Sequence, residues 1–219
     1  MAPDARPRRS MRDARTAALD AVRRVPVALA VVLLAVALLA SASSAAARGG
    51  TSIHLYMPFD GGAIASGVRV DRRAKGSCWT TSLSDARGDA FRCLVGNDIY
   101  DPCFARPPDG TATFVLCPLF TPGAAVLRLN LTKKLPPGSR SDDPTRYPPW
   151  AVQTEAGAWC TLVTGATGTI EGLQISYGCA GGASLLGDLK RSAGGWTVFF
   201  AANSRETRTP LVALRSAWW

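Results

Sequence analysis

Histidine is almost absent from this sequence, since His54 is the only one among 219 residues. Zinc sites usually combine histidines with cysteines spaced as C-x₂-C, and no cysteine pair here has that spacing. A serine hydrolase triad would have to use His54, and no G-x-S-x-G, H-E-x-x-H or phosphate-loop motif is present. We therefore expect neither a metal nor a cofactor, and no motif predicts a catalytic residue.

Dense runs of basic residues are also missing after residue 47. Seven of the 25 Lys+Arg and three of the 16 Asp+Glu lie in residues 1–47, which leaves 18 and 13 for the rest of the chain. We predict no nucleic-acid partner, because this modest surplus is not concentrated in one run. It fits an ordinary soluble surface, and it also fits long-range attraction to an anionic cell envelope.

Residues 1–47 have the composition of an export segment. Seven arginines accompany an uncharged run at 25–40, and Ala45 and Ala47 supply the small residues of a cleavage site before Arg48. The alternative is an uncleaved anchor, since the Ser/Ala tail would extend a helix of about 24 Å towards the bilayer core of about 30 Å. Both alternatives leave the arginines in the cytoplasm and the rest outside, secreted or on the extracytoplasmic face of the plasma membrane.

All six cysteines lie in the part predicted to be exported. An even number of cysteines in an oxidising compartment indicates disulfides, here three. Six cysteines allow fifteen connectivities, which the sequence alone does not distinguish. We favour pairing between neighbours because each pair brackets a turn-rich segment of hairpin size: Cys78–Cys93, Cys103–Cys117 and Cys160–Cys179.

Short apolar and alternating runs separated by glycine and proline predict a mostly β fold. We expect one or two small antiparallel sandwich or barrel units, stabilised by disulfides and preceded by the N-terminal hydrophobic export helix. The five prolines of residues 135–150 predict a linker or long surface loop. The expected organisation is an export segment or anchor at 1–47, a disulfide-containing β half at 48–134, the linker, and an antiparallel β half at 151–219.

Several local predictions concern the first half. Residues 52–58 are expected to form a strand, and 67–73 and 77–83 two further, separate strands. Residues 84–93 have room for one helical turn. Stronger strand signals follow at 111–118 and 124–132, where β-branched and alternating apolar residues dominate.

Two sets of residues are candidates for a site. Aromatic residues near turns or near the linker are the candidates for exposed ligand contacts, although core packing is the favoured role for each one taken singly: Trp79, Tyr147, Trp150 and Trp159. Carboxylates near the first cysteines could form the pair that a glycosidase needs: Asp85, Asp89, Asp98, Asp101 and Asp109. Asp98 and Asp101 also suggest a weak Ca²⁺ site, although the spacing of the known calcium loop is missing. We favour a structural role for Asp89, Arg92 and Asp101, holding loop backbone groups that strands leave unpaired.

The order of four motifs carries a resemblance to a known family: Cys-Trp at 78–79, Asp-Ala-Phe-Arg-Cys at 89–93, Asp-Pro-Cys-Phe at 101–104 and Tyr-Gly-Cys at 177–179. The sequence resembles a family of uncharacterised exported or membrane-anchored proteins of high-GC Gram-positive bacteria. The similarity covers most of residues 52–219. It implies an extracytoplasmic domain and assigns no catalytic residue.

These observations together predict a non-catalytic binding or structural domain at the cell envelope. The expected partner is an envelope polymer or a membrane protein, with membrane attachment through the N-terminal segment if that segment is uncleaved. One alternative is a secreted hydrolase that uses carboxylates of the first half, and another is the sensor or partner domain of an anchored signalling complex. The oligomeric state is left open.

Overall fold

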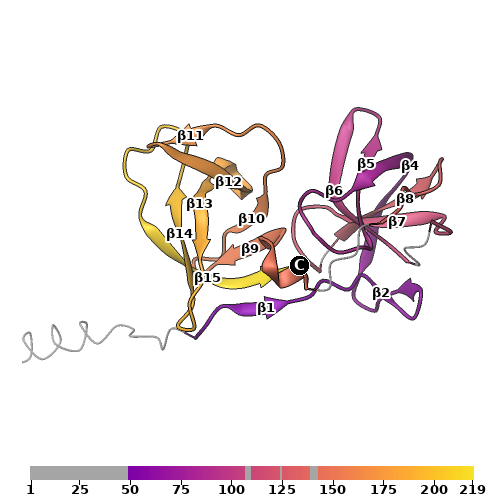
Figure 1. The fold of residues 1–219 in the computed structure, drawn as a ribbon, viewed down its shortest axis with the longest axis horizontal. Coiled ribbons are helices and arrows are strands. Elements are labelled where there is room, and N and C mark those ends of the chain that lie inside the picture. The colour runs from indigo at the N-terminus through magenta and orange to yellow at the C-terminus, as the bar shows by residue number, and fades with distance from the viewer. Residues whose placement is uncertain (1–48, 107–109, 124, 139–142) are drawn as a thin grey trace, which may run out of the picture. The chain divides into compact units, whose positions relative to one another are not determined.

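Extended strands make up nearly all the regular structure of this chain, as the alternating sequence predicts (Figure 1). The computed structural model describes residues 49–106, 110–123, 125–138 and 143–219. Within these residues it contains fifteen strands and two 3₁₀ turns, η2 (Pro144–Arg146) and η3 (Ala180–Gly182). The mostly β fold is therefore confirmed. The export helix was predicted within residues that lie outside the described ranges.

Five strands of the first half close into a small barrel: β4 (Arg69–Thr81), β5 (Ala90–Val95), β6 (Asp98–Ala105), β7 (Phe114–Pro118) and β8 (Ala125–Leu131). Neighbouring strands are antiparallel except β4 and β8, which pair in parallel and close the ring. β4 is long enough to serve both neighbours, since 69–76 pair with β8 and 77–81 with β5. A closed ring leaves no unpaired edge between its strands.

The separate strands expected at 67–73 and 77–83 are in fact one continuous strand. Gly76 looks like a break in the sequence, but it lies where β4 passes from one partner to the other. A Cβ atom there would stand 2.2 Å from the carbonyl oxygen of Leu94, so only glycine allows this approach. The helical turn suggested for 84–93 is also wrong, because residues 84–89 form an irregular loop and β5 begins at Ala90.

The second barrel contains six strands: β9 (Ala151–Thr154), β10 (Trp159–Leu162), β12 (Leu173–Cys179), β13 (Ser184–Lys190), β14 (Trp196–Ala201) and β15 (Leu211–Trp218). All their pairings are antiparallel, and β15 returns to β9 to close the ring. A short strand, β11 (Thr169–Ile170), adds to β12. The expectation of small antiparallel barrel units is confirmed.

The N-terminal strand joins the second barrel, although the sequence places it in the first half. β1 (Ser52–His54) pairs in parallel with β15, with Ser52 opposite Ser216. Two further backbone hydrogen bonds continue this pairing, Trp219 N–H to the His54 carbonyl and Tyr56 N–H to the Trp219 carbonyl. The chain then forms the hairpin of β2 (Phe59–Asp60) and β3 (Ala63–Ile64) before it enters the first barrel.

The three disulfides pair neighbouring cysteines, which confirms the favoured connectivity. Cys78–Cys93 joins β4 to β5, Cys103–Cys117 joins β6 to β7, and Cys160–Cys179 joins β10 to β12. No cysteine of the described residues is free. Loops of about 15 residues are each worth about 3 kcal/mol in the chain-entropy description. Such bridges form and persist in oxidising compartments, which is consistent with an extracytoplasmic location.

Apolar side chains fill the interiors of both barrels, and further apolar side chains form a third cluster outside these interiors. The first interior holds four of the cysteines with Phe91, Leu127 and Leu129, and the second surrounds Tyr177 and Leu185. The third cluster packs Tyr56, Phe59, Phe104 and Trp150 together, within the compact unit Arg48–Trp219. Among the described residues, no helix combines the length and hydrophobicity that crossing a bilayer requires.

Candidate functional site

The loop at 82–89, between β4 and β5, is held by its own polar residues. The Ser82 hydroxyl oxygen accepts the backbone N–H groups of Ser84 at 3.1 Å and Asp85 at 2.9 Å. The loop closes where the Ser82 N–H donates to the Ala90 carbonyl at 2.9 Å. Such short-range bonds satisfy backbone groups that would otherwise lack partners between two strands.

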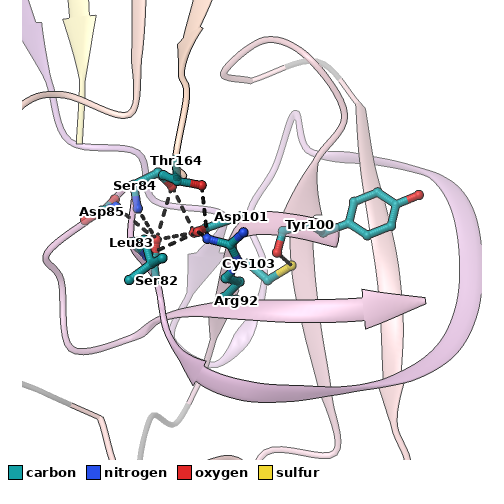
Figure 2. Close-up of polar contacts among 9 residues, drawn as sticks. All are labelled: Ser82, Leu83, Ser84, Asp85, Arg92, Tyr100, Asp101, Cys103 and Thr164. Atoms are coloured by element: carbon teal, nitrogen blue, oxygen red, sulfur yellow. Dashed lines mark hydrogen bonds and ion pairs between the residues drawn. The ribbon is translucent and has the colours of Figure 1, made fainter. Parts of the chain in front are cut away.

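Asp101 on β6 is the centre of a polar cluster around this loop (Figure 2). Its Oδ1 atom accepts hydrogen bonds from the hydroxyl groups of Ser82 and, at 2.9 Å, Ser84. Its Oδ2 atom accepts the Leu83 N–H at 3.2 Å and lies 3.5 Å from Nη1 of Arg92. The Asp101 side chain is only 5% exposed. A buried carboxylate with this many donors is a fixed anchor for the loop.

Arg92 extends the cluster towards the second half of the chain. Its Nη1 also donates to the Thr164 hydroxyl at 3.1 Å, and its guanidinium carbon lies 5.7 Å from the ring centroid of Trp79. Figure 2 shows Arg92 and Thr164 directed towards Asp101, while the Tyr100 ring points away from the cluster. Trp79 itself is 48% exposed beside this arginine.

A second polar group forms around Arg87, which is 8% exposed. Its guanidinium makes two parallel bonds to Asp89, Nε to Oδ1 at 2.9 Å and Nη2 to Oδ2 at 2.6 Å. Nη1 donates to the carbonyl of Tyr56 and, at 3.4 Å, to that of Trp219. The guanidinium also lies 4.7 Å from the ring centroid of Phe104. Arg87 therefore ties the loop to the paired segments at both ends of the described chain.

Asp85 is the one carboxyl of the loop that is incompletely paired. It is 2% exposed; Oδ1 accepts the Arg87 N–H at 2.9 Å, and Oδ2 has no hydrogen-bond partner among the described residues. Desolvation by burial raises the pKa of Asp85 to about 6, against a lowering effect of Arg87. Burial therefore disfavours the ionised carboxylate of Asp85 relative to an exposed aspartate.

This pKa shift predicts a pH dependence of stability. Because the folded pKa of about 6 exceeds the ordinary value of 3.8, the folded state holds the Asp85 proton more tightly. The stabilisation is complete below about pH 4 and is lost as the pH rises to about 6. The advantage of Asp85→Asn over the wild type in unfolding free energy should therefore grow between pH 4 and pH 7, measured by urea unfolding.

Asp98→Asn makes the same substitution at an exposed position and serves as the control. A constant difference for Asp85→Asn would show that this carboxyl is not desolvated in the folded protein.

An open groove of about 410 Å³ lies beside the polar cluster and shares Asp101 with it. Its walls include Arg72, Ile99, Tyr100, Phe120 and the buried Trp150. Phe120 is 87% exposed and Ile99 53%. Arg72 donates from Nη2 to the Tyr100 hydroxyl, which fixes a cation at the edge of the aromatic ring. The groove combines exposed apolar side chains with a few oriented polar groups, as ligand sites do.

The four aromatic residues predicted from the sequence have different environments. Trp79 is 48% and Tyr147 51% exposed, as expected for contact residues. Trp159 is half-buried, with its ring centroid 4.7 Å from that of Trp218. Trp150 is not an exposed contact residue and instead takes the favoured alternative of core packing: it is 2% exposed, because its ring packs against Tyr56 and Phe104 in the third cluster. Of the four, only Trp150 lines the groove.

Sequence reasoning missed the groove residues Arg72, Tyr100 and Phe120. Tyr100 lies on β6, a strand that was not predicted from the sequence. Phe120 had a weak signal, since a large apolar side chain stands there between Pro118 and the turn at 122–123. A large apolar side chain beside a turn is often exposed, and this position could have marked Phe120 as a contact residue.

The carboxylates considered for catalysis are mostly committed to structure. Asp89 pairs with Arg87, and Asp101 accepts donors from the 82–89 loop. Asp98 is exposed near the β5–β6 turn, and Asp109 lies outside the described residues. The His54 ring stacks on Trp218 at 4.7 Å and makes no hydrogen bond to Ser82 or Ser84. Within the described ranges, no group of three or more His, Cys, Asp or Glu side chains is arranged to hold a metal ion.

No protein-family model matches the sequence, and neither a curated protein nor a solved structure matches the chain. Its function is therefore argued from the groove and the polar cluster themselves.

Proposed function

We propose that the part of the chain after residue 47 is a non-catalytic domain that binds an envelope polymer outside the cytoplasm. The proposal rests on one observation: the residues around Asp101 hold the loop, whereas the residues of the neighbouring groove face solvent. The carboxylates suited to catalysis hold the 82–89 loop, while the adjoining groove presents Phe120, Ile99 and Arg72 to solvent. Two carboxylates line this groove, but Asp101 is engaged by the 82–89 loop and Arg92, and Asp71 is paired with Arg69, so the groove can hold a ligand without using either as a general acid or base.

The proposed location rests on two further observations. Three disulfides support an oxidising compartment. The basic, apolar and small-residue order of residues 1–47 supports export, with either cleavage before Arg48 or retention as an anchor. The motif order shared with exported or anchored proteins of high-GC Gram-positive bacteria supports the same placement.

The walls of the groove favour a polymer with both apolar and polar faces. Tyr100 and Phe120 offer aromatic rings on which a sugar ring could pack, and Arg72 and Asp71 offer a donor and an acceptor beside them. Because the groove is open, an extended chain can pass through it without any opening of the fold. A glycan of the cell envelope meets both requirements.

The Phe120→Ala variant tests this assignment with little risk to folding, because Phe120 packs on almost nothing. We expect affinity for soluble polymers released from Gram-positive cell envelopes to fall on the order of tenfold, as for removal of an aromatic anchor. Isothermal titration with the purified exported chain measures this. Leu211→Ala, at a 49% exposed position on β15, is the matched control and should bind as the wild type does. Equal affinity of the two variants for the polymer would show that the groove is not the binding site.

A hydrolase remains the second candidate because of one observation. Asp85, whose pKa is raised to about 6, and Asp101, which is paired with Arg92, are two carboxyls in unlike environments. Two carboxyls in unlike environments are what a hydrolase needs when one acts as a general acid and the other as a base. Both side chains are buried, however, and Asp85 is not among the residues that line the groove. The binding function therefore accounts for more of the structure.

A further inference from the structure

The parallel pair of β4 and β8 carries basic side chains on a common face. Arg73 is the register partner of Arg128, and Lys75 is the partner of Asn130. Residues two apart on a strand point to the same side, so Arg73 and Lys75 share a face with Arg128. Arg73 and Lys75 are exposed and Arg128 is half-buried. We call these three residues the basic strip.

The basic strip is electrostatically unfavourable in the isolated chain. Like charges directly opposite each other on paired strands are destabilising. None of the three residues forms an ion pair with any described residue. Arg128 is held with its guanidinium carbon 3.9 Å from the ring centroid of Phe114, and its buried Nε has no hydrogen-bond partner in the described part. A fixed cation without a counter-charge indicates that the counter-charge comes from outside the chain.

The surrounding sequence reinforces this charge. Lys133 and Lys134 follow β8, where Thr132 bonds through its N–H and its hydroxyl to the Gly76 carbonyl beside the strip, at 2.8 and 3.0 Å. Residues 72–84 and 110–141 contain no aspartate or glutamate. Asp71, just before the strip on β4, is already paired with Arg69 at 3.0 Å. The modest overall charge of the exported part therefore hides a locally uncompensated region.

We propose that the basic strip binds a linear polymer carrying phosphate or carboxylate groups, which specifies the ligand class of the proposed function and rests on it. Arg73 and Lys75 are about 7 Å apart along the strand, so they can meet successive charges of an extended chain. A lipid surface fits less well, because interfacial binding needs apolar side chains to insert. No large apolar side chain among the described residues of 69–78 and 125–134 is exposed.

The test uses linear inorganic polyphosphate as the polymer and orthophosphate as its monomer. For Arg73→Gln/Lys75→Gln we expect the polyphosphate Kd at low salt to rise on the order of tenfold. The slope of log Kd against log salt should fall by about two, as two counterion-releasing contacts are lost. Arg205→Gln/Arg208→Gln removes the same net charge from exposed positions after β14 and should change Kd less than about twofold.

Three results would overturn the proposal: an equal loss in both double variants, orthophosphate binding as tight as polyphosphate, or tighter binding to vesicles containing phosphatidylglycerol. Folding is checked by thermal unfolding, where the Arg73→Gln/Lys75→Gln variant should be at least as stable as the wild type because its repulsion with Arg128 is relieved. Lys75→Gln alone, opposite a neutral residue, gives a second reading with about half the change in slope.

Binding of a polymer released from the cell envelope distinguishes the contribution of the strip from that of the groove. Loss of binding in Phe120→Ala with retention in the basic-strip variant would keep the groove and reject the strip. The reverse pattern would keep the strip and reject the groove.

Discussion

Replacing Arg87 by alanine should lower the unfolding free energy of the part of the chain after residue 47 by about 3–5 kcal/mol, the usual cost of breaking a buried ion pair from one side. Arg87 holds Asp89 through two bonds and donates to the carbonyls of Tyr56 and Trp219. Its removal leaves a partly buried carboxylate and two carbonyl groups without these donors. Urea unfolding under non-reducing conditions measures the change.

Arg69→Ala is the matched control for this prediction. Arg69 also pairs with an aspartate, Asp71 at 3.0 Å, but the two side chains are 72% and 45% exposed. Exposed pairs contribute about 0–1 kcal/mol. Arg87→Lys should fall between the two, because an ammonium keeps the charge and loses the planar fork. If Arg87→Ala cost no more than Arg69→Ala, Arg87 would not join the loop to the chain ends in solution.

The Asp101→Ala variant should lose a similar amount of unfolding free energy, about 3–5 kcal/mol, because it leaves Arg92, whose side chain is 14% exposed, without its carboxylate. Ser82, Ser84 and the Leu83 N–H lose their acceptor at the same time. We expect a lower melting temperature and a lower yield of folded protein. Asp101→Asn keeps one acceptor oxygen and should lose less.

Exposed Asp98, on the same strand, provides the comparison, and Asp98→Ala should have little effect on stability. The pattern also separates structure from catalysis. An Asp101→Ala protein that kept the melting temperature of the wild type but lost a hydrolytic activity would establish the hydrolase instead.

The parts of the fold that depend on local pattern were predictable. Residues 114–118 and 125–131 alternate or carry β-branched side chains, and both are strands. Neighbouring cysteines pair because each pair lies on strands joined within one short segment. Closure of a hairpin brings such residues opposite each other with no long-range information.

The parts that depend on contacts distant in sequence were not predictable. The pairing of β1 with β15 joins Ser52 to Ser216, and no local signal specifies a parallel partner. The burial of Trp150 arises from Tyr56 and Phe104, which lie far away in the chain. The groove and the basic strip likewise need β6 or the β4–β8 register before their residues become neighbours. Charge composition alone could therefore not reveal the strip.

The most direct test of a non-catalytic binding domain is the length of a bound polymer before and after prolonged incubation. The protein, with its three disulfides intact, is incubated with polymers released from Gram-positive envelopes, and the polymers are then sized by gel filtration. We predict saturable binding that Phe120→Ala weakens, with an unchanged polymer length distribution. Shortening by the wild type that the Asp101→Asn variant fails to produce would contradict this account and identify the polar cluster as a catalytic site.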